Sequence, residues 1–250
     1  MLLLTIETAS RVCSVALARD GVILDTRESS AHNAHSAVLT VFISELLVSA
    51  GIEPTALDAV AISMGPGSYT GLRIGVATAK GLCYAIGKPM IAVPTLLGMA
   101  KGMRDAGCGM WDPLSQISDL RSQISDLTSH IPFFVPMLDA RRMEVYCAVY
   151  DGNLAEIMPT EAKIIDENSF GDLLSAGPVI FAGEGAEKCR SMLGDHPNAR
   201  FVQGFEASAK YLVPLAMERY SKGQFENLAY FEPFYLKDFV AGKPRVKGLR

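Results

Sequence analysis

A glycine-rich stretch in the first third of the chain decides the fold, and it reads Ile62-Ser63-Met64-Gly65-Pro66-Gly67-Ser68-Tyr69-Thr70-Gly71-Leu72-Arg73-Ile74-Gly75. The short apolar run before it, residues 57–62, predicts a buried strand, and the apolar run that continues to about residue 86 predicts a helix. Free N–H groups at the start of a helix attract anions. The stretch therefore predicts either a nucleotide-binding loop or simply a tight turn between a strand and a helix.

Composition is that of an ordinary globular protein. The chain has 250 residues, of which 49% are hydrophobic and 20% charged, and its formal net charge of −4 argues against a general affinity for polyanions. No apolar run is long enough to span a bilayer, and the first residues lack a signal-peptide pattern, so we expect no membrane association. Five scattered cysteines, mostly inside apolar runs, predict reduced thiols in a cytoplasmic protein.

The C-terminus departs from this charge balance. This segment contains several basic residues and a single acid, Asp238. Such a tail either contacts nucleic acid or is simply a solvated terminus. The basic residues are Lys237, Lys243, Arg245, Lys247 and Arg250.

Two hairpin patterns recur along the chain. The first is formed by Leu2–Glu7 and Val12–Ala18, and the second by Phe133–Asp139 and Val145–Tyr150. In both, the first strand ends in an acidic residue, a short turn containing arginine follows, and the second strand closes at an Asp-Gly pair, which favours tight hairpins. Two similar halves predict a duplicated, two-lobed α/β fold of mixed sheets and crossover helices, with a cleft between the lobes.

This arrangement of acids and glycine turns resembles the actin, Hsp70 and sugar-kinase type of ATPase fold, which is ribonuclease H-like. In working members of that fold the hairpin acids hold a metal-bound nucleotide, and the glycine turns approach phosphate and adenine. Here the first turn has no glycine, and no lysine follows Gly65-Pro66-Gly67 in a P-loop pattern, so a Walker site is excluded. The resemblance implies a vestigial nucleotide cleft lined by Glu7, Thr8, Gly65, Gly67, Asp139, Gly183 and Gly185.

Two helices of the first half predict a contact surface. Residues 33–50 predict a helix that ends at Gly51 and is apolar on most sides, so we expect a second cover beyond its own sheet. In the next helix small residues recur every four positions and form a narrow stripe. The stripe either admits a partner helix or packs on the chain's own sheet. The expected contact residues are Leu39, Phe42, Ile43, Leu46, Gly71, Arg73, Gly75, Ala79 and Cys83.

The chain divides into three parts by pattern. Residues 1–105 predict the first lobe with the partner-binding helices, and 132–250 predict the second lobe, whose last helix and tail pack back on the first. Between them, 106–131 reads as an insertion that contains a near-perfect seven-residue tandem repeat over 115–128. Two heptads are too few for an independent coiled coil, so the repeat predicts a linker helix without chemistry.

Catalytic and metal-binding patterns are not evident. His32 and His35 could share a helix face, but no further ligands accompany them, and the spacing of zinc proteases is missing. Ser63, Ser68 and Thr70 have no nearby His/Asp pattern and are expected to cap the following helix. We therefore expect no catalytic residue, no metal and no cofactor.

The glycine-rich motif also resembles the signature of the TsaB (YeaZ) family. Further matches follow in chain order and span nearly the whole chain, apart from the 115–128 repeat. They are Ile6-Glu7-Thr8-Ala9, His35-Ser36, Ala77 to Leu82, Pro94-Thr95, Asp139-Ala140-Arg141, Glu144-Val145-Tyr146 and Pro233-Phe234-Tyr235-Leu236.

The resemblance implies a non-catalytic, cytoplasmic subunit. Its expected partners are a TsaD-type transferase and a TsaE-type ATPase, with which it serves to place threonylcarbamoyl on the adenosine beside the tRNA anticodon. The family pairs through the two-helix face, here 34–50 and 71–86, and forms a homodimer through that region when alone. Replacing Gly75 or Ala79 with Leu is then expected to weaken pairing. Contact with tRNA would be indirect or through the basic tail.

Two other functions remain as alternatives. A stand-alone nucleotide-binding enzyme of the actin or sugar-kinase type would turn over Mg-ATP with the help of Glu7 and Asp139. A metalloprotease would bind stoichiometric zinc, and the small number of candidate ligands argues against it.

Overall fold

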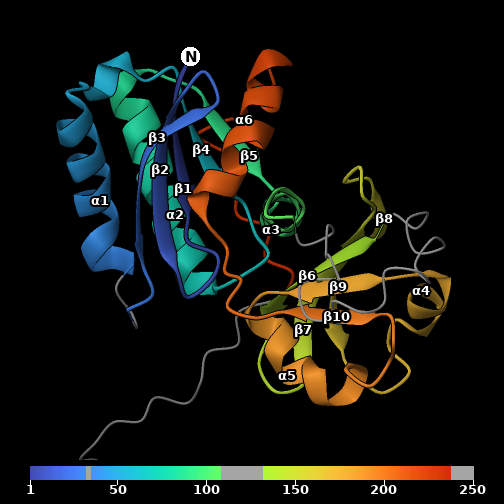
Figure 1. The fold of residues 1–250 in the computed structure, drawn as a ribbon. Helices are drawn as coiled ribbons and strands as arrows, with labels where there is room; N and C mark the ends of the chain where they lie inside the picture. The colour runs from blue at the N-terminus through green and yellow to red at the C-terminus, as the bar shows by residue number, and fades with distance from the viewer. Residues whose placement is uncertain (32–34, 108–131, 238–250) are drawn as a thin grey trace, which may run out of the picture.

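The computed structural model describes residues 1–31, 35–107 and 132–237, which form two lobes with one five-stranded sheet each (Figure 1). The strand order is β3-β2-β1-β4-β5 in the first sheet and β10-β9-β6-β7-β8 in the second. The first sheet contains β1 (Leu2–Glu7), β2 (Cys13–Arg19), β3 (Val22–Ser29), β4 (Ala59–Ser63) and β5 (Met90–Val93). The second contains β6 (Phe133–Asp139), β7 (Glu144–Tyr150), β8 (Glu156–Ile164), β9 (Val179–Ala182) and β10 (Ala199–Val202).

The two sheets have the same topology. Each central strand, β1 or β6, pairs antiparallel with the next strand of its hairpin and parallel with the strand on its other side, β4 or β9. This repetition confirms the duplicated, two-lobed α/β fold expected from the sequence. It also places the ends of β1 and β6 at corresponding positions of the two lobes.

Helices cover both faces of each sheet. In the first lobe α1 and α2 pack on one face and α6 on the other, whereas in the second α4 and α5 share a face opposite α3 (Figure 1). Helix α3 follows β5 but packs on β6 and β7, and α6 follows β10 but packs on β4 and β5. Each lobe thus contributes a helix to the other. The bounds are α1 (His35–Ala50), α2 (Tyr69–Ile86), α3 (Thr95–Asp105), α4 (Gly171–Ala176), α5 (Glu184–Leu193) and α6 (Leu212–Ser221).

Local chemistry explains why α2 begins and ends where it does. Ser68 caps its first turn by accepting a hydrogen bond from the Gly71 N–H, and Gly87 ends it in the left-handed conformation that favours glycine. Two short 3-10 helices, Pro54–Ala56 and Ala209–Tyr211, lie in the connections before β4 and before α6.

Several sequence expectations concern residues outside the described part. The tandem repeat over 115–128, most of the 106–131 insertion and the basic tail beyond Lys237 all lie there. Sequence patterns did not identify β5, α3, β8 or β10. None of the described helices is both long and apolar enough to cross a membrane.

Candidate functional site

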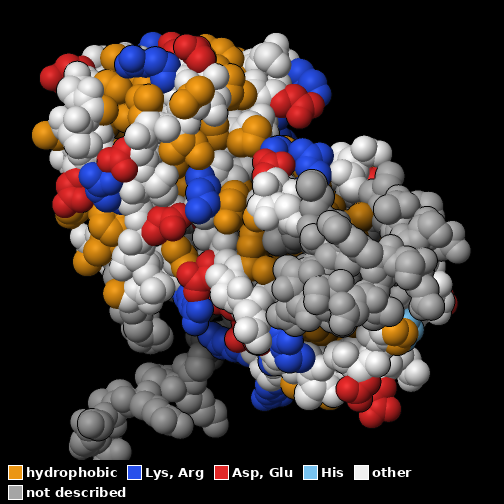
Figure 2. All heavy atoms as spheres, in the orientation of Figure 1, with side chains coloured by type: hydrophobic (Ala, Val, Ile, Leu, Met, Phe, Trp, Pro, Cys, Tyr) orange, Lys and Arg blue, Asp and Glu red, His pale blue; other side chains and the backbone are white. Residues whose placement is uncertain are grey.

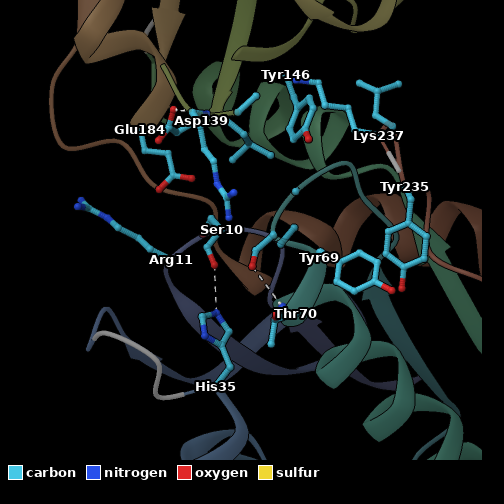
Figure 3. Close-up of a pocket in the computed structure, with 18 of the residues that line it drawn as sticks. Ser10, Arg11, His35, Tyr69, Thr70, Asp139, Tyr146, Glu184, Tyr235 and Lys237 are labelled. Carbon is cyan, nitrogen blue, oxygen red and sulfur yellow. Dashed lines mark hydrogen bonds between the residues drawn. The ribbon is translucent and has the colours of Figure 1, made fainter. Parts of the chain in front are cut away.

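A cleft of about 1470 Å³ lies between the lobes (Figure 3). The turns of both hairpins and the first residues of α1 and α2 form its walls, and residues 235–237 form part of its rim. The side chains labelled around it in Figure 3 are Ser10, Arg11, His35, Tyr69, Thr70, Asp139, Tyr146, Glu184, Tyr235 and Lys237.

The acid of the first hairpin lies behind the cleft rather than in it. Glu7 is 1% exposed, and its Oε1 accepts a hydrogen bond from the Ala9 N–H at 2.6 Å. Burial raises the pKa of the Glu7 carboxyl to about 7, although hydrogen bonds from Ala9, Ser63 and Thr8 oppose the shift. Glu7 therefore holds the turn in place and does not face the open space.

The glycine-rich turn before α2 packs closely on the first hairpin turn. A Cβ at Gly67 would overlap the Ala9 carbonyl oxygen, which accepts the Ser68 N–H at 2.6 Å. A Cβ at Gly71 would likewise overlap the Thr8 carbonyl oxygen. The glycines let backbone pack against backbone, and the Ser68 and Gly71 N–H groups at the start of α2 donate within the protein. The stretch therefore forms the tight turn that the sequence allowed as the alternative to a phosphate loop.

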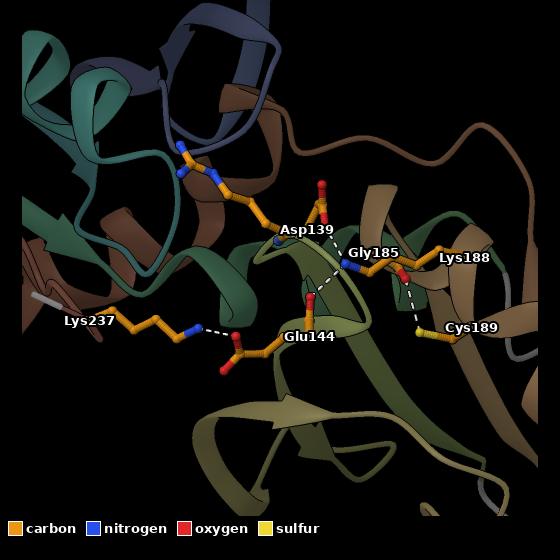
Figure 4. Close-up of polar contacts among 7 residues, drawn as sticks. Asp139, Glu144, Gly185, Lys188, Cys189 and Lys237 are labelled. Carbon is orange, nitrogen blue, oxygen red and sulfur yellow. Dashed lines mark hydrogen bonds and ion pairs between the residues drawn. The ribbon is translucent and has the colours of Figure 1, made fainter. Parts of the chain in front are cut away.

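The acid of the second hairpin is accessible. Asp139 is ion-paired to Lys188 of α5 and accepts the Arg141 N–H at 3.0 Å (Figure 4). Lys188 also donates to the Glu144 carbonyl at 2.6 Å, and the Glu144 carboxylate is ion-paired to Lys237 from the C-terminal segment. These contacts fix the turn that carries Arg141 and Arg142, both exposed on the cleft wall.

Only part of the predicted nucleotide cleft lines the cavity. Gly67 and Asp139 do so, whereas the remaining residues are buried behind it. These are Glu7, Thr8, Gly65, Gly183 and Gly185. That a nucleotide binds there stays a prediction.

Several cleft residues were not singled out as site residues. They are Tyr69, Arg141, Arg142, Tyr146 and Tyr235. The arginine in the second hairpin turn and the aromatic motif near the C-terminus were the signals that could have found them.

Most of the expected contact residues on α1 and α2 point into the first lobe. The expected contact residues are buried, apart from Phe42, which is half-buried, and Arg73, which is exposed. Leu39, Ile43, Leu46, Ala79 and Cys83 belong to the core. A Cβ at Gly75 would overlap the Thr8 hydroxyl, so Gly75→Leu disrupts the lobe itself and does not isolate an effect on pairing. The small-residue stripe packs on its own sheet, which was the alternative interpretation.

The outward side of the same two helices carries different residues. Val41 is 48%, Val48 77% and Tyr84 84% exposed. Among the exposed residues of α1 and α2, only Glu45 and Arg73 are charged, and Glu45 lies 3.7 Å from the Arg27 guanidinium. A nearly uncharged helix face is typical of the centre of a protein–protein interface.

Metal-ligating side chains do not gather in the described ranges, where no group of three or more His, Cys, Asp or Glu residues is positioned to hold an ion. His35 Nε2 lies 3.1 Å from the Ser10 carbonyl oxygen, and His32 is outside the described residues. Burial raises the pKa of the Cys13 thiol to about 11 and that of Cys83 to about 12, so both stay protonated at neutral pH.

Comparison with known proteins agrees with this fold. A family model described as "TsaD: tRNA N6-adenosine threonylcarbamoyltransferase" matches residues 27–119. The Escherichia coli "tRNA threonylcarbamoyladenosine biosynthesis protein TsaB" is 28% identical over 249 residues, covering 97% of each chain. A Moorella thermoacetica "tRNA N6-adenosine threonylcarbamoyltransferase" is 47% identical over 64 residues, 26% of this chain and 19% of that one. The solved structure "YeaZ from Pseudomonas aeruginosa" superposes with a TM-score of 0.76 at 24% identity, covering 94% of this chain and 99% of that chain.

Proposed function

The chain belongs to the TsaB (YeaZ) family, and on that premise we propose that it acts in the formation of threonylcarbamoyladenosine in tRNA as a non-catalytic subunit paired with a TsaD-type transferase. Its place of action is the cytoplasm. The names of its curated relatives support the role in this tRNA modification. A TsaE-type ATPase completes the proposed assembly, and the isolated chain forms a homodimer through the same surface.

The outward face of α1 and α2 is the proposed pairing surface, and its composition carries the proposal. Val41, Val48 and Tyr84 expose apolar side chains where α1 and α2 leave few charges. Burying such a face removes apolar area from water at roughly 25 cal/mol per Å², without the penalty of desolvating unpaired charges. Figure 2, in the orientation of Figure 1, shows hydrophobic side chains on the viewer's side of the first lobe as well, so exposed apolar side chains are not confined to α1 and α2.

The state of the two hairpin acids supports a non-catalytic role. Glu7 is buried under its own turn, and Asp139 is ion-paired to Lys188. The Glu7 carboxylate is therefore not exposed to bind a metal or act as a general base, and the Asp139 carboxylate is accessible but engaged by a lysine. Reactivity of the complex is then expected to reside in the TsaD-type partner.

Pairing is tested by size-exclusion chromatography with a TsaD-type transferase. Val48→Asp and Tyr84→Asp each place a charge in the proposed interface and should abolish co-elution. Ile164→Asp is the matched control, since Ile164 is 71% exposed on β8 of the second lobe and should leave co-elution intact. Unchanged co-elution of both α1–α2 variants would reject this surface.

A further inference from the structure

We propose that the interlobe cleft binds a single strand of RNA, with phosphates held by Arg141 and Arg142 and bases stacked on the tyrosines of the opposite rim. The inference goes beyond the proposed pairing function, because it concerns a different surface. That the bound strand belongs to tRNA rests on the proposed function. That the cleft binds single-stranded RNA at all rests on the residues that line it.

The cations of the second turn are available to a ligand. Neither Arg141 nor Arg142 forms an ion pair with any other residue in the described ranges, and both are exposed on the cleft wall. By contrast, Lys237 is engaged by Glu144, and Arg11 by Glu206. Guanidinium groups bind phosphate oxygens in a bidentate manner, which makes two free arginines a phosphate-binding pair.

Two of the three acids that line the cleft are neutralised by ion pairs. Asp139 is held by Lys188, and Glu144 by Lys237 (Figure 4). The third acid, Glu184, is only partly exposed, and burial raises the pKa of its carboxyl. The cleft therefore tolerates phosphate although the chain as a whole has a net charge of −4.

The backbone of the second turn is consistent with a functional role for the arginines. Arg141 has φ = 74° and Arg142 φ = 51°, a region that residues with side chains seldom adopt. The Arg141 N–H is held by the Asp139 carboxylate at 3.0 Å. Such conformations concentrate at binding sites, where the surrounding contacts over-determine them.

Aromatic rings supply the second half of the site. The Tyr69 and Tyr235 rings lie 4.8 Å apart by centroid, and Tyr146 stands elsewhere on the wall with Lys237 over its ring at 5.8 Å (Figure 3). Arginines beside aromatic rings in a groove are the combination that binds single-stranded nucleic acid, because every base has a face that can stack. Hydroxyls of Ser10, Ser36 and Thr70 add hydrogen-bonding groups along the same walls.

The size of the cleft favours a strand over a free nucleotide. Its volume of about 1470 Å³ exceeds the roughly 300–1000 Å³ of ordinary small-molecule pockets. The Ser68 N–H before α2 is moreover already used by the Ala9 carbonyl and is not available to a phosphate. An extended ligand can reach the second-turn arginines and the tyrosine rim together.

The test is fluorescence anisotropy of a labelled single-stranded RNA of about 12 nucleotides with the full-length protein over a salt series. Arg141→Ala/Arg142→Ala should weaken binding about tenfold or more, and should reduce the slope of log K against log salt by about 1.4, or roughly 0.7 per phosphate contact. Arg19→Ala/Arg219→Ala is the control, because it removes the same charge at residues that do not line the cleft. It should change the RNA affinity and the salt slope little. Tyr235→Ala should weaken binding while leaving the salt slope unchanged.

Three results would overturn the proposal. Equal losses in the two double-arginine variants would mean that only net charge matters. Undiminished binding by Arg141→Ala/Arg142→Ala would assign the RNA to another surface, the basic tail included. Full displacement of the RNA by an equal concentration of ATP would assign the cleft to free nucleotides. Val48→Asp should bind RNA normally, which separates failure of this proposal from failure of the pairing surface.

Discussion

The hairpin turns after β1 and β6 occupy corresponding places in the two lobes. The first, which we call the sealed turn, buries Thr8, Ala9 and Ser10 and exposes only Arg11 at its end, whereas the second is open. Thr8 and Ala9 are buried beneath the glycine turn, whereas Arg141 and Arg142 are exposed. The cause is the length of the next strand–helix connection. It runs from Ser63 to Tyr69 in the first lobe but only from Ala182 to Glu184 in the second.

This difference shows how a duplicated fold can separate two roles. The longer connection covers the first turn and makes it part of the rigid core beneath α2. The shorter one leaves the second turn free to present side chains to the cleft. The sealed turn supports the helices of the proposed pairing face, and the open turn supplies the proposed ligand contacts.

The largest difference between the two turns is expected in the pH dependence of stability. The pKa of Glu7 is about 7 in the folded protein and near 4.5 when unfolded, so the folded state binds more protons within that window. The free energy of unfolding contributed by Glu7 should therefore fall by roughly 3 kcal/mol as the pH rises from 4.5 to 7, then stay level. Glu7→Gln should remove this decline in urea unfolding curves.

Asp139→Asn is the matched change in the open turn. Asp139 is exposed and its ion pair with Lys188 is worth at most about 1 kcal/mol, so this variant should keep the pH dependence of the wild-type protein. An undiminished decline in Glu7→Gln would show that the sealed turn does not bury its acid as described, whereas a smaller remaining decline is expected from Glu184, whose pKa is also raised by burial.

A smaller effect is expected from adding one methyl group to α2. Gly71→Ala forces a Cβ against the Thr8 carbonyl and should lower the free energy of unfolding by roughly 2 kcal/mol. Gly81→Ala, in the same helix, meets open space and should raise it by up to about 1 kcal/mol. In α5, the Cβ of Gly185→Ala would lie 2.8 Å from Leu138, a milder overlap with an intermediate expected cost. Equal stabilities of the α2 variants would contradict the sealed turn.

The smallest effect concerns the backbone of the open turn. Arg142→Gly removes a side chain from a residue with φ = 51° and should stabilise the protein by about 1 kcal/mol in thermal unfolding. The same change should weaken RNA binding, because a guanidinium is lost. If Arg142→Gly instead gained both stability and RNA affinity, RNA binding would no longer explain the positive φ of Arg142.

The sequence predicted the repeated hairpins well because alternating acids, turns and apolar strands are local signals. The end of α2 before Gly87 follows from such local chemistry too. The strands β5 and β10 have four residues each, and pairing with neighbours distant in sequence defines them. Local periodicity carries little information about such short elements.

The contact residues on α1 show a different limit. The helix is apolar on most sides, so periodicity cannot say which side the sheet takes. Leu39, Ile43 and Leu46 face the core, while Val41 and Val48 face outward. Packing on β2 and β3 makes that choice, and it depends on the tertiary structure. The cleft tyrosines were equally inaccessible to local reasoning, because Tyr69 and Tyr235 meet only through the path of the C-terminal segment.

The most direct measurement is the transfer of radiolabelled threonylcarbamoyl to tRNA in a reconstituted reaction with a TsaD-type transferase, a TsaE-type ATPase and a threonylcarbamoyl donor. We expect product only when this chain is present, with Val48→Asp and Tyr84→Asp reducing it to background and Ile164→Asp supporting it fully. Equal product without the chain, or full activity of both α1–α2 variants, would contradict the account.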